Sequence, residues 1–478
     1  MKKTFILSAG VSTPLPARKG WGWLSLVLLM GAMTFTSCSK DDDKNNEEPA
    51  FSVTETTPLV DADNYSPNTT AANYSVKSFG ETAIDGCSDV VSQLEAANAV
   101  IGSAKLSEAQ EAYLREVLKN LVNNVIVPTY TKLADNTEAL EKTLHGLTVA
   151  TITQAQIDEA CRDFKAARMY WEQSEAFLGG AASDFDIDPT IDSWPLNRSL
   201  LLSYFNNGMN DEMLDDATIL GFHALEFILF RDGQPRKVAE LKGNDTYKNF
   251  ENVTGEQELA YAQTICTLLK QRTFQLQCAW DGGKDASRMA VVKAAGLDYQ
   301  TEKGLSFGDN LINAGISGKN SSFPTLKDAI AQVLSDDEGS CLAIANEVGT
   351  AKIANPFSAG DVSYVESPYS YNSIADFRDN IRSIRNVWLG STDKKANKYS
   401  FHTFFASVKQ DAVNNKVEGA CVSAIEAISN MPSPFVKYCC TIWNIAFEDD
   451  EDWDDNFGIL FGSSFEVQEN IAIFAHNL

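Results

Sequence analysis

The residues with the clearest chemical potential are His223 and Glu226, three positions apart in "TILGFHALEFILF", Thr218 to Phe230. On an α-helix this spacing places both side chains on one face, with Cβ atoms about 5–6 Å apart. Their neighbours are almost all apolar, which predicts a buried helix. A buried carboxylate must be hydrogen-bonded, ion-paired or bound to a metal, because an unpartnered charge is unfavourable away from water.

Two interpretations of this pair stay open on spacing alone. The first is a buried histidine–glutamate pair that joins two helices, with Arg168 or Arg198 as a third member. The second is a metal or ligand site, since imidazole and carboxylate groups suit cations. Gly221, expected inside the same helix, costs roughly 0.8–1 kcal/mol relative to alanine. A glycine there indicates that another backbone or a ligand comes close.

The elements that position these residues are predicted to be helices. Apolar residues recur at helical spacing from about Cys87 onward, and strand alternation is nearly absent. The helix of His223 is expected to begin at Asp215 or Asp216 and to end with Gly233 as a left-handed cap. Pro128 is expected at a kink or break. Further helical patterns cover residues 154–178, 255–280, 285–296, 325–348, 373–389, 397–430, 434–447 and 464–475. The sequence therefore predicts an all-α fold built from two helical-bundle domains.

The N-terminal segment is predicted to direct export. Basic residues precede a short apolar run that ends in "FTSC", which is typical of a secretory signal. This ending resembles a bacterial lipobox with Cys38 as the lipidated residue, although Phe35 departs from the usual leucine. The following "SKDDDKNNEE" resembles the acidic export tag of Bacteroidetes surface lipoproteins. We therefore expect a signal peptide over 1–37, an acidic and polar linker over 38–86, and helical bundles over 87–285 and 286–478.

Charge and cysteine content narrow the classes of function. The net charge of -26 argues against nucleic-acid binding, which requires a basic surface. Apart from Cys38 the chain has eight cysteines and no CxxC pair, so a zinc knuckle is not supported. In an exported protein these cysteines could pair, but the pairing cannot be deduced from the sequence. Buried free thiols remain an equal alternative.

Several stretches resemble one known family. "GFHALE" matches the GxHxxE signature of the imelysin-like family, which includes peptidase M75 domains linked to bacterial iron uptake. "ARMYWEQSEAFL" resembles the family's Arg-x-x-Trp-x-x-Ser-Glu helix, "DPTIDSWPLN" its Asp-Pro loop, and "SIADFRDNIRSIRNVWLG" its C-terminal helix. The resemblance implies two four-helix bundles, a ligand site between them that includes the signature helix, and a cell-envelope role tied to iron.

The resemblance also implies the residues of this site. The metal- or ligand-binding residues would be His223, Glu226, Arg168, Glu175 and Asp192, and the pocket or structural residues Gly221, Trp171, Ser174 and Trp194. Arg168 would hold a carboxylate by a bidentate bond, with a surface salt bridge as the alternative. The two tryptophans are read as core or pocket wall. Asp192 is either a third ligand or a turn residue, and the turn is the preferred reading.

The function implied is an exported lipoprotein that binds a metal or a small ligand. Iron is the leading candidate, with zinc or calcium as other divalent cations. A metallopeptidase of the M75 type is an alternative, but the chain lacks HExxH, and Phe227 follows Glu226 where HxxEH needs histidine. A protein- or peptide-binding surface module without metal is a second alternative. The chain is expected on the outer membrane, at the periplasmic face or cell surface, held by its N-terminal lipid alone, with a possible envelope protein as partner.

Overall fold

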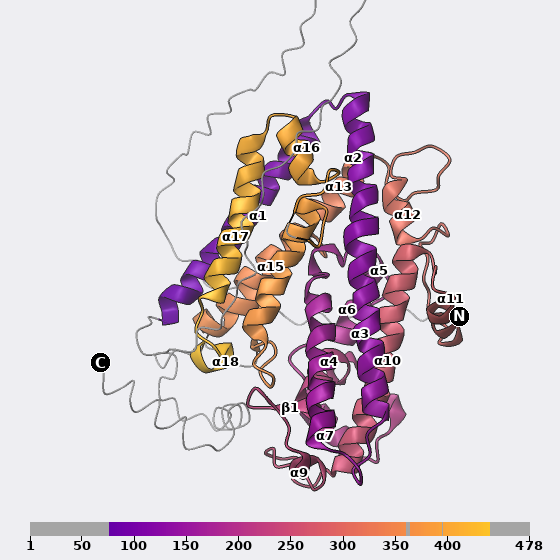
Figure 1. The fold of residues 1–478 in the computed structure, drawn as a ribbon, viewed down its shortest axis with the longest axis vertical. Helices are drawn as coiled ribbons and strands as arrows, with labels where there is room; N and C mark the ends of the chain where they lie inside the picture. Colours follow the sequence, from indigo (N-terminus) through magenta and orange to yellow (C-terminus); the bar gives the residue numbers. More distant parts are fainter. Residues whose placement is uncertain (1–75, 360–363, 394, 440–478) are drawn as a thin grey trace, which may run out of the picture. The chain divides into compact units, whose positions relative to one another are not determined.

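Helices make up nearly all of the regular structure in the computed structural model, which describes residues 76–359, 364–393 and 395–439 (Figure 1). This confirms the predicted all-α class. The longest helices are α1 (Val76–Ser103), α3 (Val127–His145), α4 (Gln154–Glu172), α10 (Gly255–Asp281), α15 (Ser373–Leu389) and α17 (Asp411–Ser429). The strands β1 (Phe230–Arg231) and β2 (Gln234–Pro235) form one short antiparallel hairpin.

Shorter helices connect the long ones. The α-helices among them are α2 (Glu108–Leu121), α5 (Ala181–Asp184), α6 (Ile187–Asp192), α7 (Arg198–Asn206), α8 (Gly221–Leu229), α9 (Val238–Leu241), α11 (Ala286–Ala294), α12 (Phe307–Ile312), α13 (Leu326–Ser335), α14 (Cys341–Glu347), α16 (Phe401–Ser407) and α18 (Phe435–Tyr438). The 3₁₀ turns are η3 (Glu175–Phe177), η4 (Asp211–Asp215) and η5 (Ala217–Ile219), and the π-helices are η2 (Val122–Ile126) and η6 (Val348–Ala359).

The long helices pack as two neighbouring groups. Helices α3, α4, α8 and α10 pack on one another, while α1 packs on α17, α13, α14 and η6. The groups meet where α15 contacts α4 and where η3 contacts α14 and α15. One large cluster of buried apolar side chains runs through both. Helix α1 thus packs on helices from the far end of the chain, while the boundary proposed at residues 285 and 286 stays a prediction.

A π-helical turn precedes Pro128, where a kink or break was expected. Proline lacks the N–H that would donate one turn back, and its ring crowds the carbonyl there. The chain accommodates it with the wider turn of η2, after which α3 begins with proline in its first turn. Such π-turns inside helices relieve local misfit without ending the helix.

Several predicted helix limits are wrong. The patterns at 325–348 and at 397–430 each contain two separate α-helices, α13 with α14 and α16 with α17. Helix α1 begins before Cys87, at Val76, and α8 begins at Gly221 instead of Asp215 or Asp216. Asp216 caps the short turn η5 instead, where its carboxylate accepts from Thr218 N at 2.9 Å. Such local side-chain bonds compete with a continuous helix. Gly233 does not cap α8 but lies between β1 and β2 with φ of +74°, as tight hairpin turns require.

Some predictions fall outside the described residues. They concern the signal peptide at 1–37 with Cys38, the linker up to residue 75, the end of the 434–447 helix and the helix at 464–475. Among the described helices, none is long and apolar enough to cross a membrane. Six of the cysteines are buried free thiols, which bears out that alternative for them: Cys87, Cys161, Cys266, Cys278, Cys341 and Cys421.

Candidate functional site

Gly221 brings two short helices together at the site. It begins α8 with φ of +72°, and a Cβ atom added there would lie 2.1 Å from the carbonyl oxygen of Ile191. Only glycine allows this approach of the α6 backbone. Asp192 follows Ile191 at the end of α6. The contact between Gly221 and Ile191 therefore places the Asp192 carboxylate beside His223. The glycine therefore serves the close backbone approach that the sequence indicated, at a helix start instead of a helix interior.

His223 lies on α8, every residue of which is buried. Its Nε2 atom is 3.2 Å from Asp192 Oδ1, and its Nδ1 atom is 3.4 Å from Glu226 Oε2. Burial disfavours the charged ring, but the two carboxylates outweigh it and raise the pKa of His223 to about 9. The contact with Asp192 lacks hydrogen-bonding geometry, so Nε2 is a buried atom with no hydrogen-bond partner among the described residues.

Glu226 uses its carboxylate to hold backbone and histidine in place. Its Oε1 atom accepts hydrogen bonds from Tyr369 N at 3.1 Å, Ser370 N at 2.7 Å and Ser370 Oγ at 2.6 Å. The other oxygen faces His223 Nδ1. Carboxylates in this position typically orient a ligating histidine from behind. The geometry thus makes Glu226 a positioning residue for His223, with no free oxygen turned to the same target.

Arg168 is the hub of the cluster. It lies on α4 with no solvent exposure, so it is not a surface salt bridge. Its guanidinium contacts the carboxylates of Asp192, Glu172 and Glu366, and its Nε atom is 3.8 Å from Asp376 Oδ2. A planar guanidinium with five donors suits such multiple contacts. Arg168 therefore neutralises and aligns carboxylates that belong to three separate segments of the chain.

Asp192 receives support from two sides. Trp171 Nε1 donates to its Oδ2 atom at 2.6 Å, and Ser174 Oγ bonds the Trp171 carbonyl at 2.7 Å. Burial alone would raise the pKa of Asp192, but Arg168 and then His223 outweigh burial and hold it far below the usual range. Asp192 is only 7% exposed. The residue is thus a fixed carboxylate of the site as well as the last residue of a short helix.

Buried carboxylates outnumber buried cations here. Six carboxylates, of Glu172, Glu175, Asp192, Glu226, Glu366 and Asp376, lie near three cationic side chains, Arg168, His223 and Lys352. Burial raises the pKa of Glu172 and of Glu175 well above the ordinary value, and that of Asp376 to about 7. Without a further cation, the cluster holds protons in order to limit its negative charge.

The donor atoms fit a metal ion. Two sets, Asp192 with His223 and Glu366, and Glu172 with Glu175 and Asp192, each offer ligand atoms within 4.8 Å of one another, and they share Asp192. We call these five residues the acidic centre. His223 Nε2 and Glu366 Oε2 are buried atoms without hydrogen-bond partners among the described residues. Buried polar atoms that lack a hydrogen-bond partner are uncommon, and a bound ligand is one explanation for them.

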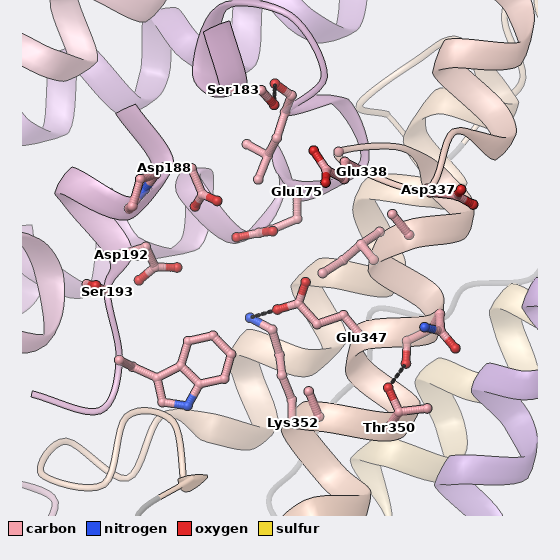
Figure 2. Close-up of a pocket in the computed structure, with 18 residues that line it drawn as sticks. Glu175, Ser183, Asp188, Asp192, Ser193, Asp337, Glu338, Glu347, Thr350 and Lys352 are labelled. Atoms are coloured by element: carbon pink, nitrogen blue, oxygen red, sulfur yellow. Dashed lines mark hydrogen bonds and ion pairs between the residues drawn. The ribbon is translucent and has the colours of Figure 1, made fainter. Parts of the chain in front are cut away.

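An acidic cavity of about 630 Å³ adjoins the acidic centre (Figure 2). Glu175 points into it and has no hydrogen bond or ion pair with any described residue, although it is only 5% exposed. Trp194 forms part of the wall, and its Nε1 atom donates to Tyr364 O at 3.3 Å. The charged residues that line the cavity are Glu175, Asp188, Asp192, Asp337, Glu338, Glu347 and Lys352.

The structure brings most of the predicted residues together. Arg168, Trp171, Ser174, Glu175, Asp192, Gly221, His223 and Glu226 meet around the acidic centre, and Trp194 lies at the cavity wall. Arg198 lies outside and donates to Tyr247 Oη at 3.0 Å. Glu172, Glu366, Asp376 and Lys352 also belong to the site, although the sequence did not predict them. Glu172 could have been found, since it follows Arg168 by one helical turn.

The fold and the site define an all-α protein with a buried, carboxylate-rich centre around one histidine. A family model described as imelysin, peptidase M75, matches residues 126–451. The chain belongs to the imelysin (peptidase M75) family. Among the described histidines, His223 alone belongs to the candidate ligand sets. His145 contacts Glu141 and Thr267 instead, and His402 lies on α16. The two-histidine arrangement of HExxH zinc peptidases is therefore not formed among the described residues.

Similar proteins carry names that refer to iron. "Iron-regulated protein A" of Synechococcus elongatus is 25% identical over 285 residues, which are 59% of this chain and 66% of the relative, just under two thirds of its length. A crystal structure of a protein named as an iron-regulated protein A precursor, from Parabacteroides distasonis ATCC 8503, is 24% identical. It covers 69% of this chain and 96% of its own, with a TM-score of 0.52, and this similarity concerns the fold.

Proposed function

We propose that this chain binds a metal cation, with iron as the leading candidate, at the acidic centre. One observation carries the proposal: six buried carboxylates face only three cationic side chains among the described residues. Glu175, one of the six, forms no hydrogen bond or ion pair with a described residue. A divalent or trivalent cation would replace the protons that burial favours on Glu172 and Glu175, whose pKa values are raised well above the ordinary value. Oxygen ligands with one imidazole suit iron and also other divalent ions such as zinc.

The surrounding residues support the same proposal. Arg168 and Trp171 fix Asp192, and Glu226 fixes the ring of His223. Such supporting contacts orient ligands, and their loss typically weakens metal affinity roughly 10–100-fold. An anionic ligand would meet an acidic cavity, which disfavours it. The name of the relative, iron-regulated protein A, is the reason to place iron before other cations.

A place in the cell envelope is the second part of the proposal. Support comes from the sequence, where basic residues, an apolar run and Cys38 form a lipoprotein-type signal. The chain would then be anchored by lipid to the outer membrane, at its periplasmic face or at the cell surface. Cys38→Ser should abolish lipid labelling and release the protein from the membrane fraction, and retention of both properties would refute the anchor.

The metal proposal is tested by titration. Purified protein without its N-terminal segment is titrated calorimetrically with Fe²⁺ under anaerobic conditions, with Zn²⁺ and Ca²⁺ as comparisons. We expect stoichiometric binding of Fe²⁺ by the wild type and its loss in His223→Ala. His145→Ala is the matched control, because this exposed histidine lies away from the acidic centre. Absence of binding by the wild type, or unchanged binding by His223→Ala, would refute a metal site that includes His223.

A further inference from the structure

Lys352 is a buried ammonium at the edge of the acidic centre. It lies on the π-helix η6, is 1% exposed and lines the acidic cavity (Figure 2). Its Nζ atom is 3.0 Å from Glu366 Oε1 and 3.7 Å from Glu347 Oε1. The same atom lies 5.2 Å from the centre of the Trp194 ring, within cation–π range. Among the described residues that line this cavity, Lys352 is the only basic one.

Arg168 and Lys352, two of the three buried cations of the cluster, differ in how firmly they are held. Arg168 contacts Asp192, Glu172 and Glu366 with a rigid, planar group. Lys352 has a flexible four-carbon stem, and it shares its nearer partner, Glu366 Oε1, with Arg168. Its other contacts, Glu347 and Trp194, lie on the cavity wall. Moving the ammonium from Glu366 toward the cavity therefore costs less free energy than moving the guanidinium would.

A cation at the acidic centre would meet the charge of Lys352. Glu366 belongs to one candidate ligand set and is the nearer partner of the ammonium. A cation bound beside Glu366 would be repelled by the ammonium, because like charges at short range repel more strongly inside a protein than in water. Removal of the lysine charge would thus strengthen cation binding, provided that the protein remains folded.

We propose that Lys352 competes with cations for the carboxylate of Glu366. In the metal-free protein its ammonium is paired with Glu366, and this ion pair must break when a cation binds. This inference rests on the proposed metal function. Lys352 would then favour ions of higher charge, because an ion of low charge gains too little binding free energy from the carboxylates to displace the ammonium. The opposite view, in which Lys352 only stabilises the fold, predicts no gain in affinity when it is replaced.

The test compares Fe²⁺ affinity between variants under anaerobic conditions. Lys352→Met keeps the aliphatic stem and removes the charge, and we expect at least about tenfold tighter binding than in the wild type. Lys352→Arg keeps the charge and should bind no more tightly than the wild type. Lys270→Met is the matched control, because Lys270 pairs with Glu141 at 2.5 Å away from the acidic cavity. Its affinity should equal that of the wild type.

Melting temperatures give a second readout. Without metal, Lys352→Met should melt below the wild type, because it leaves Glu366 less neutralised. With Fe²⁺ bound, it should melt at or above the wild type, so the metal-induced shift grows. Equal or weaker affinity of the folded variant would refute the competitor role while leaving the metal site intact. If neither protein binds Fe²⁺, both proposals fall. Should circular dichroism show Lys352→Met unfolded, Lys352→Gln replaces it in the same comparison.

Discussion

Asp192 joins the two candidate ligand sets, and His223 and Glu175 approach it from different directions. His223 comes from α8 and is aligned by Glu226, whereas Glu175 comes from η3 and faces the acidic cavity. A ligand that must stay fixed needs such support from behind. Glu175 lacks it among the described residues, so it is the carboxylate most ready to receive a cation that enters from the cavity.

Glu175→Gln should separate binding from folding. Glutamine keeps the shape and resembles the protonated carboxyl that burial favours in the empty protein. Fe²⁺ affinity should fall more than the roughly 10–100-fold that loss of a supporting contact causes. The melting temperature without metal should stay close to that of the wild type. Calorimetric titration and thermal melts measure the two quantities, with Glu141→Gln as a control distant from the site. Unchanged affinity would exclude Glu175 as a ligand.

Glu226→Ala should affect stability and binding together. It leaves the buried N–H groups of Tyr369 and Ser370 without an acceptor, at about 1–3 kcal/mol each. His223 also loses its orienting partner. We therefore expect a clear drop in the free energy of unfolding by urea and a roughly 10–100-fold loss of Fe²⁺ affinity. Glu226→Gln, which retains an acceptor oxygen, should recover part of the stability. A stable Glu226→Ala protein would contradict the positioning role.

At the scale of elements, the site depends on short helices that approach one another closely. Helices α6 and α8 meet at Ile191 and Gly221, and η6 carries Lys352 from the other group of helices. Because α6 and α8 are short and η6 is an irregular π-helix, the geometry of all three depends on tertiary contacts more than on helix propensity. Substitutions at their junctions should disturb the site even without touching a ligand.

Gly221→Ala should be strongly destabilising. The added methyl would overlap the Ile191 carbonyl, and a φ of +72° is unfavourable for alanine, with strain of about 1–3 kcal/mol from the backbone alone. Gly102→Ala is the matched control, since nothing lies within 4 Å of its added Cβ and it lies near the end of α1. Alanine favours helix there by up to about 1 kcal/mol. Urea unfolding that shows equal effects at both glycines would contradict the close approach.

Helical periodicity predicted which segments are helical better than it predicted where the helices begin and end or which residues they bring together. The all-α class followed from apolar spacing, and α15 matched its predicted range of residues 373–389. The spacing of His223 and Glu226 predicted a shared helix face, but their partner Asp192 came from the family resemblance. Glu366 and Lys352 reach the acidic centre from the second half of the chain. No local pattern marks such contacts, because only the packing of the two helix groups creates them.

For the whole molecule, the balance of buried charge predicts an unusual pH dependence. Burial raises the pKa of Asp188, Asp376 and Glu258 to about 7, and neighbouring carboxylates raise that of His223 to about 9 against burial. Groups with raised pKa values stabilise the folded state at low pH, and this contribution is lost as the pH rises through those values. The lowered pKa of Asp192 does not alter this trend, because that carboxyl stays ionised throughout this range.

The metal-free protein should therefore lose stability between pH 5.5 and pH 9. Urea unfolding at several pH values measures this directly, and His223→Gln should remove the part of the fall above pH 6.5. Saturating Fe²⁺ should reduce the part of this fall that comes from His223 and Asp376, since a bound cation takes over the role of the protons there. The part that comes from Glu258 should remain, because Glu258 pairs with Arg236 outside the acidic centre. If the free energy of unfolding of the metal-free protein instead rises over this pH range, the buried carboxylates are ionised in the empty protein.

The most direct test of a cation site at the acidic centre is the number of protons released when the cation binds. Calorimetric titration of the wild type with Fe²⁺ at pH 7, in two buffers of different ionisation enthalpy, gives this number. We predict one cation bound per chain with net release of protons, because Glu172 and Glu175 hold protons in the empty site. Absence of binding, or binding without proton release, would contradict a site in which a cation replaces protons on buried carboxylates.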